Sequence, residues 1–252
     1  MCVCVCVCVW STLFSSSPQT PSLSLFFHPL LALLVRLFGF FFFFSFFFFL
    51  HPASPVGAYY ATGFKPVRLL ADPQFVRAWP GGMGDTKCGG NYAPTILPQM
   101  HAAKKDCQQV LWLFGEDELV TEVGTMNLFM HWKNDEGVEE LITAPLDGTI
   151  LAGVTRQSIL DLGRQWGEFQ VSEKYFTMSQ LTRALKEGRV YEMFGSGTAA
   201  TVSPVGEILY RDEPLSIPLE LGSSGKLSKR FMDELFAIQY GEVEHEWAPV
   251  VC

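Results

Sequence analysis

The order of apolar and polar positions predicts a series of short strands and amphipathic helices. Apolar runs of strand length occur at residues 67–71, 109–114, 119–132 (interrupted by Gly124) and 140–144. Apolar positions at helical spacing occur at residues 94–106, 155–163, 179–187 and 226–240. Residues 170–176 alternate like a strand, whereas residues 192–204 are rich in Gly, Ser, Thr and Ala and predict a loop. Because these elements interleave without a regular βαβ rhythm, we expect a mixed α/β fold.

One position conflicts with its predicted helix. Pro98 lies within the helix predicted for residues 94–106, and a proline inside a helix costs about 3 kcal/mol or bends it. We therefore expect either this cost or a kink at Pro98.

The first 54 residues differ in composition from the rest of the chain. Residues 2–9 alternate Cys and Val, and residues 40–49 are all Phe except Ser45, so 13 of the 22 Phe fall before residue 50. An alternating TG dinucleotide followed by a T-rich tract encodes such peptides, which favours translated intron-like DNA ahead of an ordinary coding segment. We interpret residues 1–54 as a non-globular, low-complexity and hydrophobic segment, and residues 55–252 as the folded domain.

The N-terminal segment allows two other interpretations. Residues 30–50 are long enough to span a bilayer and carry only Arg36 as a charged residue, so they would partition into lipid. A signal peptide fits poorly, because no basic region precedes the apolar stretch and the stretch is too long. Membrane association through residues 30–50 is therefore expected only if this segment is part of the protein that is made.

Charge and cysteine content bear on the functional class. A net charge of −8 and the lack of any Lys/Arg-rich run argue against a nucleic-acid partner. Beyond the N-terminal repeat, Cys88, Cys107 and Cys252 are too widely spaced for a disulfide framework, which indicates a reducing compartment. No Cys/His cluster has zinc-ligand spacing and no GxxxxGK[ST] loop occurs, so we expect no metal site.

Three stretches carry residues that suit catalysis or ligand binding. Lys87 lies between glycine clusters, where backbone can approach a ligand and an amine can bond an aldehyde; a solvated loop lysine is the alternative. Glu122, flanked by apolar residues on a predicted strand, needs a cationic partner or a proton donor; a protonated pyridine nitrogen or a structural salt bridge would meet this need. GVTR at 153–156 and GSGTAAT at 195–201 are candidate anion sites or plain connectors.

Together these stretches resemble the branched-chain amino acid aminotransferases of animals, which are fold-type IV enzymes that use pyridoxal phosphate. The resemblance covers about residues 55–251 and includes the blocks RAW (77–79), GGMGDTKCGGNY (81–92), QVLWL (109–113), TEVGTMN (121–127), WGEF (166–169), FGSGTA (194–199) and IQYG (238–241). It implies the cofactor-binding large domain of a class IV aminotransferase, with pyridoxal 5′-phosphate as cofactor. It also implies Leu, Ile or Val as amino donor, 2-oxoglutarate as acceptor with glutamate as its product, and a homodimer.

The resemblance also implies roles for individual residues. Lys87 matches the catalytic lysine that forms the Schiff base with the cofactor, and Glu122 matches the carboxylate that keeps the pyridine nitrogen protonated. The other implied cofactor contacts are Tyr92, near the phenolic oxygen, and Thr125, Val154, Thr155 and Thr198. The implied substrate contacts are Tyr59, Thr198 and Ala199.

Two departures from the family pattern change what is expected. Ala200 and Ser203 occupy positions where animal members often carry a Cys-x-x-Cys redox pair, so we expect no thiol control there. The smaller N-terminal domain, which supplies a phosphate-binding arginine and part of the pocket, has no recognisable counterpart ahead of residue 55. We expect a branched-chain aminotransferase, with an inactive truncated domain or a membrane-associated product as alternatives. The local sequence leans towards the cytosolic form, which favours a cytoplasmic location.

Overall fold

The computed structural model describes residues 65–249, which lie within one compact unit of the chain, Ala58–Cys252. The strands are β1 (Val67–Ala71), β2 (Gln109–Phe114), β3 (Leu119–Val123), β4 (Met126–Lys133), β5 (Glu139–Thr143), β6 (Gln170–Glu173), β7 (Val190–Gly197), β8 (Thr201–Tyr210) and β9 (Glu213–Ser216). The helices are α2 (Gly89–Tyr92), the 3-10 helix η1 (Ala93–Thr95), α3 (Ile96–Lys104), α4 (Val154–Trp166), α5 (Met178–Lys186) and α6 (Lys226–Gln239).

The strands form one mixed sheet that closes on itself. Its order is β3-β2-β1-β8-β7-β4-β5-β6, and β3 also pairs with β4, so the first six strands in this order form a ring. β5 and β6 continue beyond β4, and β9 pairs with β8. β1 is parallel to β2 and β8, whereas β4 is antiparallel to β3, β5 and β7. This combination of strand directions and interleaved helices confirms the expected mixed α/β fold.

Alternate side chains of the strands face two different cores. On β1, Leu69 belongs to the cluster enclosed by the ring, whereas Leu70 packs with side chains of α3 and β2 outside it. On β4, Leu128 faces the ring interior and Phe129 packs with side chains of α4 and α6. Because both faces of these strands are buried, their sequences are mostly apolar and lack the regular alternation of a half-exposed sheet.

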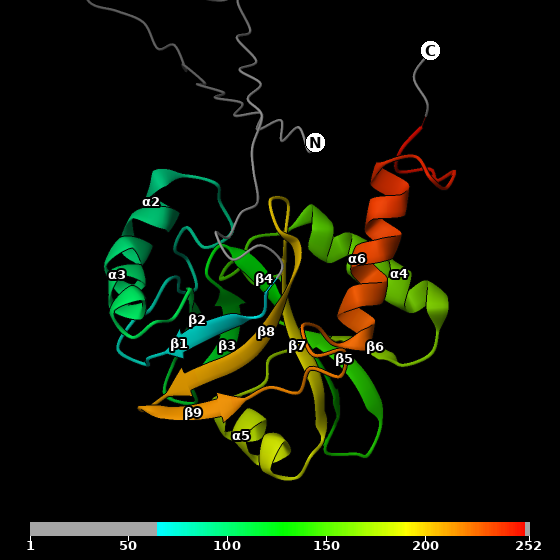
Figure 1. The fold of residues 1–252 in the computed structure, drawn as a ribbon. Helices are drawn as coiled ribbons and strands as arrows, with labels where there is room; N and C mark the ends of the chain where they lie inside the picture. The colour runs from blue at the N-terminus through cyan, green and yellow to red at the C-terminus, as the bar shows by residue number, and fades with distance from the viewer. Residues whose placement is uncertain (1–64, 250–252) are drawn as a thin grey trace, which may run out of the picture. The chain divides into compact units, whose positions relative to one another are not determined.

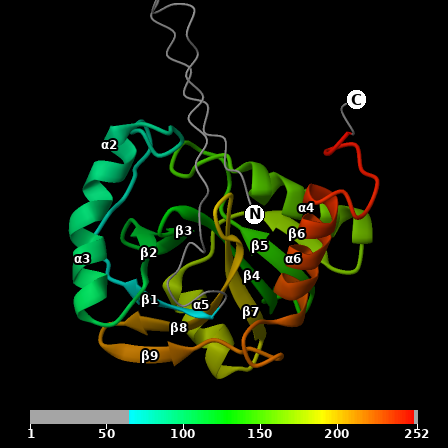
Figure 2. The same ribbon diagram turned by 45° about the horizontal axis from the view of Figure 1, so that its top comes forward.

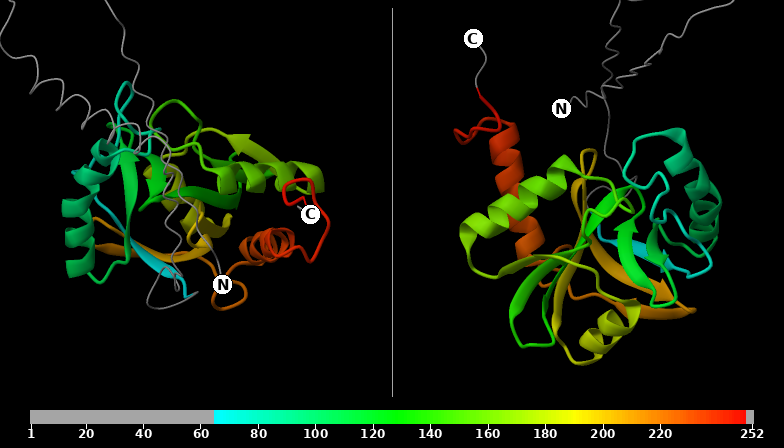
Figure 3. Two further views of the ribbon diagram at one scale, coloured as in Figure 1. Left: turned by 90° about the horizontal axis from the view of Figure 1, so that it is seen from above. Right: turned by 180° about the vertical axis from the view of Figure 1, so that it is seen from behind.

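The helices cover the ring from several sides. Figures 1 and 2 show α2 and α3 beside β1 and β2, and α4 and α6 on the opposite side, beside β4 to β7. Figure 3 shows α4 and α6 from two further directions; they meet where the rings of Trp166 and Phe231 stack 4.6 Å apart. α5 contributes Met178 and Leu181 to the ring cluster. The sheet end that carries the predicted site residues is at the top of Figure 1, near α2 and the start of α4.

The loop predicted for residues 192–204 is wrong. These residues form an antiparallel hairpin, in which β7 and β8 pair from Phe194 opposite Pro204 to Gly197 opposite Thr201. Only residues 198–200 form its turn. Small side chains suggested a loop, yet the hairpin is buried between the ring cluster and the α4–α6 cluster. Tertiary packing has overridden the weak strand propensity of these residues.

Three smaller expectations also differ from the structure. Pro98 is the third residue of α3, in the first helical turn, where its missing N–H has no intrahelical acceptor to lose, so the expected kink does not follow. α4 continues to Trp166, beyond the predicted end at residue 163. β6 stops at Glu173, although Phe176 beyond it is still part of the core.

Within residues 65–249 no helix is long and apolar enough to cross a membrane. The expectations for residues 1–54, for a span at residues 30–50 and for Tyr59 fall outside the described part of the chain.

Candidate active site

Two hairpin turns lie at the same end of the ring. β3 and β4 are joined by Gly124 and Thr125, and β7 and β8 are joined by residues 198–200. The register places Glu122 opposite Asn127 and Asn127 opposite Ser196, so β3, β4 and β7 lie side by side at this end. The fold therefore brings four of the predicted site residues to one end of the sheet, namely Glu122, Thr125, Thr198 and Ala199.

Glu122 is a buried carboxylate, with 3% of its surface exposed. Its Oε1 accepts hydrogen bonds from the backbone N–H of Leu151 (2.9 Å) and from the side-chain amide of Asn127 (3.1 Å). Its Oε2 lies 3.1 Å from the guanidinium of Arg77. Burial raises the pKa of Glu122 to about 7, against the opposing effects of Arg77, the Leu151 N–H and the charge of Lys87. The carboxylate therefore exchanges its proton close to neutral pH, which is typical of groups at functional sites.

Arg77 is the cationic partner of Glu122 and is itself buried. One terminal nitrogen donates to Oδ1 of Asn91 (2.6 Å), and the other donates to the carbonyl oxygens of Thr149 and Gly84. The salt bridge that the sequence left open as an alternative for Glu122 is therefore present. The sequence prediction missed Arg77, Asn91 and Asn127, although a lone arginine between Val76 and Ala78 was a signal of a buried, paired charge.

Lys87 and Tyr92 lie in the segment that Arg77 and Asn91 anchor. Lys87 is exposed, and it is near enough to Glu122 for its charge to lower the pKa of that carboxylate. Tyr92 is the half-buried last residue of α2. The structure thus puts the predicted lysine and the predicted carboxylate within electrostatic range of each other.

The N-terminus of α4 reaches the same end of the sheet. Val154 is 82% exposed and Thr155 is half-buried, and no side chain caps the helix at Gly153. The first N–H groups of a helix have no intrahelical acceptor, and the helix dipole makes this end attractive to anions. A Cβ at Gly153 would overlap Oδ1 of Asn127, so the start of α4 packs directly on a hydrogen-bond partner of Glu122.

The β7–β8 turn offers further polar groups. Thr198 and Ala199 are exposed there. Ser196, two residues earlier, is only 1% exposed, and its Oγ has no hydrogen-bond partner among the described residues. This end of the sheet therefore combines an amine, a buried carboxylate, a helix N-terminus and a hydroxyl-bearing turn.

The comparisons with known proteins identify the family of this chain. Residues 61–208, more than half of the chain, match the model of the family described as amino-transferase class IV. The chain belongs to this family.

Relatives of this class IV aminotransferase chain include branched-chain-amino-acid aminotransferases. The protein from Monosiga brevicollis is 69% identical over 198 residues, which cover 79% of this chain and 51% of that protein. A cytosolic form from Ovis aries is 56% identical (79% of this chain, 51% of that protein), and a mitochondrial form from Bos taurus is 57% identical (77% and 49%). The chain therefore spans about half the length of these relatives. Such similar identities to both forms do not assign the expected cytoplasmic location.

Solved structures show the same fold. The branched-chain amino acid aminotransferase of Escherichia coli superposes with a TM-score of 0.62 at 28% identity, covering 77% of this chain and 59% of that one. Another branched-chain amino acid aminotransferase, complexed with N-(5′-phosphopyridoxyl)-L-glutamate, superposes with a TM-score of 0.56 at 27% identity, covering 71% and 54%. The class IV aminotransferase fold expected from the sequence is thereby confirmed.

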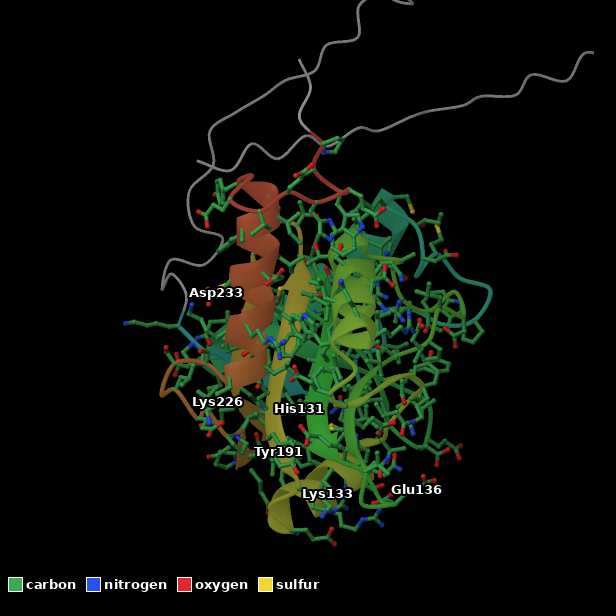
Figure 4. All side chains as sticks on the ribbon, turned by 90° about the vertical axis from the view of Figure 1, so that its right-hand side faces the viewer. His131, Lys133, Glu136, Tyr191, Lys226 and Asp233 are labelled. Carbon is green, nitrogen blue, oxygen red and sulfur yellow. The ribbon has the colours of Figure 1, made fainter. Side chains whose placement is uncertain are left out.

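A groove of about 360 Å³ lies away from these residues, at the far part of β4. Figure 4 shows His131, Tyr191 and Lys226, which line it. Its polar side chains are largely paired with each other: His131 with Glu139, and Lys226 with Glu220. Among the residues described, no group of three or more His, Cys, Asp or Glu side chains is placed to hold a metal ion. The groove is thus separate from the end of the sheet around Glu122, where the residues predicted from the sequence lie.

Proposed function

We propose that this chain carries the cofactor-binding part of a branched-chain amino acid aminotransferase that uses pyridoxal 5′-phosphate. The observation that carries the proposal is the buried Glu122, which has a pKa of about 7 and lies within electrostatic range of Lys87. The names of the relatives support the reaction, and the phosphopyridoxyl compound in a related structure supports the cofactor. Residues 55–252 constitute the cofactor-binding domain in this proposal, and residues 1–54 lie outside it.

The residues at this end of the sheet fit the cofactor. A pyridine ring needs an anionic acceptor for its N–H, an aldehyde needs an amine, and a phosphate needs backbone N–H donors. The site offers the Glu122 carboxylate, the exposed Lys87 amine and the uncapped start of α4 at Val154 and Thr155. When bound, pyridoxal phosphate supplies an aldehyde for this amine and a pyridinium ring that accepts the electron pair released when a substrate loses its α proton.

Each polar residue of the site has a distinct task in this reaction. Glu122 holds the proton on the ring nitrogen, and its burial makes that charge-assisted contact strong. Lys87 would hold the cofactor at its aldehyde carbon, and its free amine would move a proton to or from the substrate Cα. Tyr92 orients the phenolic oxygen, and Thr125 completes the contacts on the β3–β4 side. Val154, Thr155 and Thr198 hold the phosphate.

The substrates of this reaction are leucine, isoleucine or valine as amino donor and 2-oxoglutarate as acceptor, with glutamate as product. Thr198 and Ala199, exposed on the β7–β8 turn, receive the substrate carboxylate. Tyr59, to which the family resemblance assigns a substrate contact, lies outside the described residues. The glutamate moiety in the related phosphopyridoxyl complex supports glutamate as one substrate. No observation within residues 65–249 favours the inactive-fragment or the membrane-associated alternative over this function.

A second copy of the chain is the partner that we propose. Residues 76–100, which include the Lys87 segment, expose several large apolar side chains to solvent: Trp79 (53% exposed), Met83 (50%), Ile96 (63%), Leu97 (57%) and Met100 (56%). Exposed apolar surface of this kind marks an interaction site. Sedimentation of the purified chain tests this; a monomer at all concentrations, with or without cofactor, would contradict the dimer.

Trapping the cofactor on the chain tests the proposed function. The full-length chain is incubated with pyridoxal phosphate, reduced with borohydride and digested, and the pyridoxyl-modified peptide is identified by mass spectrometry. We expect one dominant label at Lys87, its complete loss in Lys87→Ala, and its retention in the control Lys104→Ala, since Lys104 is an exposed lysine in the last turn of α3. A label on Lys104 or Lys105 with none on Lys87 would contradict the assignment.

A further inference from the structure

A single buried guanidinium contacts three segments of the proposed site. Arg77 has 5% of its surface exposed, and its terminal nitrogens reach the Glu122 carboxylate, the carbonyl oxygens of Gly84 and Thr149, and Oδ1 of Asn91. Gly84 precedes Lys87 by three residues, and Thr149 precedes the start of α4 by five. The segments that carry the amine, the ring-facing carboxylate and the phosphate-binding helix therefore meet at one side chain.

Asn91 extends this contact to the residue next to Lys87. Its Nδ2 donates to the carbonyl oxygen of Thr86 (2.9 Å) and, more weakly, to that of Gly84 (3.3 Å), while its Oδ1 accepts from Arg77 (2.6 Å). Asn91 is 2% exposed, so its bonds to Arg77 and Gly84 are shielded from water. A continuous path of hydrogen bonds thus runs from Glu122 through Arg77 and Asn91 to the peptide that precedes Lys87.

Leu151 closes the network on the other side. Its backbone N–H donates to Oε1 of Glu122 (2.9 Å), and Thr149, two residues earlier, accepts from Arg77. The 149–151 segment is therefore held at two points, once by the carboxylate and once by the guanidinium, and it leads directly into Gly153 at the start of α4.

We propose that Arg77 is a positioning residue of this site: its charge keeps Glu122 available as an anion, and its fork fixes the Lys87 segment relative to that carboxylate. This inference rests on the proposed function only for the tasks that it assigns to the Glu122 carboxylate and the Lys87 amine. The first role needs a positive charge, because a buried carboxylate without one takes up a proton. The second role needs the planar guanidinium, because an ammonium cannot donate in fixed directions to Glu122, Asn91 and Thr149 together.

The charges that face Glu122 are consistent with the first role. Burial raises the pKa of Glu122 to about 7, and the largest opposing influence is Arg77, followed by the Leu151 N–H, Lys87 and Arg156. Lys87 is exposed, so solvent screens its charge. The Lys87 amine would also change its bonding when it holds a cofactor, whereas the Arg77 guanidinium is buried and its contacts are within the protein.

Infrared titration of the full-length chain without cofactor tests the charge role. The absorption of the protonated Glu122 carboxyl is assigned by its loss in Glu122→Gln and followed with pH in each variant. We expect Arg77→Gln to move the Glu122 midpoint upward by at least about one pH unit, and Arg77→Lys to move it by clearly less. Arg164→Gln is the control, because Arg164 pairs with Glu173 and Asp161 away from Glu122. An unchanged midpoint in Arg77→Gln would overturn the charge role.

Hydrogen–deuterium exchange tests the positioning role in the same cofactor-free chains. We expect the peptide spanning residues 84–92 to exchange at least about tenfold faster in Arg77→Lys and in Asn91→Ala, because both variants cut the path to Thr86 while keeping a cation near Glu122. The β5–β6 peptides should be unchanged. If both variants keep wild-type exchange at residues 84–92, the positioning role is wrong. If Arg77→Gln does not fold, Arg77→Lys and Asn91→Ala still test the positioning role. Asn91→Ala keeps the Arg77 charge, so its Glu122 midpoint should be close to that of the wild type.

The outcome is independent of the proposed function, because neither measurement involves pyridoxal phosphate. Failure of Lys87 labelling would remove the aminotransferase proposal and leave the Arg77 measurements valid. Normal labelling of Lys87, together with unchanged titration and exchange in the Arg77 variants, would keep the proposed function and remove this inference alone.

Discussion

The two ends of β4 each carry a buried carboxylate on a neighbouring strand, and the two differ in their partners. At one end, Glu122 of β3 lies opposite Asn127; at the other, Glu140 of β5 lies opposite Trp132. Glu140 is fully buried, accepts a hydrogen bond from Nε1 of Trp132 (2.9 Å) and pairs with the ammonium of Lys174 (2.8 Å). Burial opposes ionisation of Glu140, but the bonds from Lys174, Ser172 and Trp132 outweigh it and lower its pKa.

The comparison shows that burial alone does not mark a functional carboxylate. Glu122 and Glu140 are both inaccessible to solvent, yet the pKa of one is raised to about 7 and that of the other is lowered. Glu140 is satisfied by partners that only stabilise its charge. Glu122 shares its cation, Arg77, with Asn91 and two carbonyl oxygens, so its ionisation is incompletely stabilised. A buried carboxylate whose charge is incompletely stabilised gains most from a further cationic partner, such as a protonated ring nitrogen.

Exchanging each carboxylate for its amide tests this comparison, and here we expect the largest effect. Glu122→Gln should slow the single-turnover reaction of the cofactor-loaded chain with leucine by about 10²–10³-fold, because a neutral amide cannot hold the ring nitrogen protonated in a dry site. Cofactor binding, followed by absorbance, should be largely retained. Glu140→Gln should instead lower the free energy of unfolding by about 1–3 kcal/mol and leave the reaction of the folded protein unchanged.

The contrast between the two amide variants decides whether the ends of β4 have different tasks. Equal slowing of the reaction in both variants would assign the effect to general destabilisation. An unchanged single-turnover rate in Glu122→Gln would remove Glu122 from the proposed mechanism.

The pH dependence of stability should also separate the two carboxylates. The pKa of Glu122 in the folded chain, about 7, is above its ordinary value of 4.5, so the folded state holds this proton more tightly than the unfolded state. Its contribution is full below pH 4.5 and is lost as the pH rises through about 7, an effect of up to about 3 kcal/mol. The lowered pKa of Glu140 acts in the opposite direction: its contribution is present above pH 4.5 and is lost as the pH falls through the folded-state pKa.

Urea unfolding between pH 4 and 8 measures this dependence. The free energy of unfolding of the wild type, relative to that of Glu122→Gln, should rise as the pH is lowered from 8 to 5. Relative to that of Glu140→Gln, it should be highest at neutral pH. Parallel pH profiles for the two pairs would show that the environments of these carboxylates are alike.

Much of this end of the sheet was predictable from sequence, because its parts are local. The apolar runs that became β1 and β2 and the Gly124 break between β3 and β4 follow directly from residue pattern. The start of α4 after Gly153 was also predicted. The conclusion that Lys87 and Glu122 serve one site came from the order of motifs, since residues 35 positions apart give no spacing signal of their own. The structure supports their proximity through the electrostatic effect of Lys87 on Glu122.

The parts that were missed depend on contacts distant in sequence. The β7–β8 hairpin was predicted as a loop, because Gly, Ser and Ala have weak strand propensity and only packing against α4 and α6 determines its form. Arg77 was overlooked for the same reason, because its ion pair with Glu122 joins two segments that are far apart in the sequence. The sequence gives the ionisable side chains, whereas their burial and pairing in the fold decide which of them remain reactive.

Gly153 and Gly225 each pack closely against a side chain, and they lie at different places in the fold, so they allow a smaller test. A Cβ at Gly153 would overlap Oδ1 of Asn127, and a Cβ at Gly225 would overlap the carboxylate of Glu192. Both Gly153→Ala and Gly225→Ala should destabilise the fold by about 1–3 kcal/mol, because the neighbour must move. Only Gly153→Ala should also weaken cofactor binding, by about tenfold, since it displaces the start of α4 and a donor to Glu122. Equal cofactor affinity in both variants would contradict a phosphate site at α4.

The smallest expected effect concerns the cap of α5, at the other end of β3 from Glu122. Thr177 bridges to Leu119, its Oγ1 accepts a hydrogen bond from the backbone N–H of Gln180 (3.1 Å), and its own N–H donates to Oε1 of Gln180 (2.9 Å). Thr177→Ala removes the hydrogen bond that Oγ1 accepts from Gln180 and should lower the free energy of unfolding by about 1 kcal/mol. Thr177→Ser keeps the hydroxyl and should lose less of this free energy. Because α5 packs Met178 and Leu181 into the ring cluster and begins next to Leu119, at the other end of β3 from Glu122, labelling of Lys87 by pyridoxal phosphate should be unchanged in both variants. Urea unfolding and the labelling assay are made on the same preparations. Reduced labelling in Thr177→Ala, at a pH and temperature where the chain is fully folded, would show that this end of the ring is coupled to the site. The division of tasks along the strands would then be less sharp than the comparison of Glu122 with Glu140 indicates.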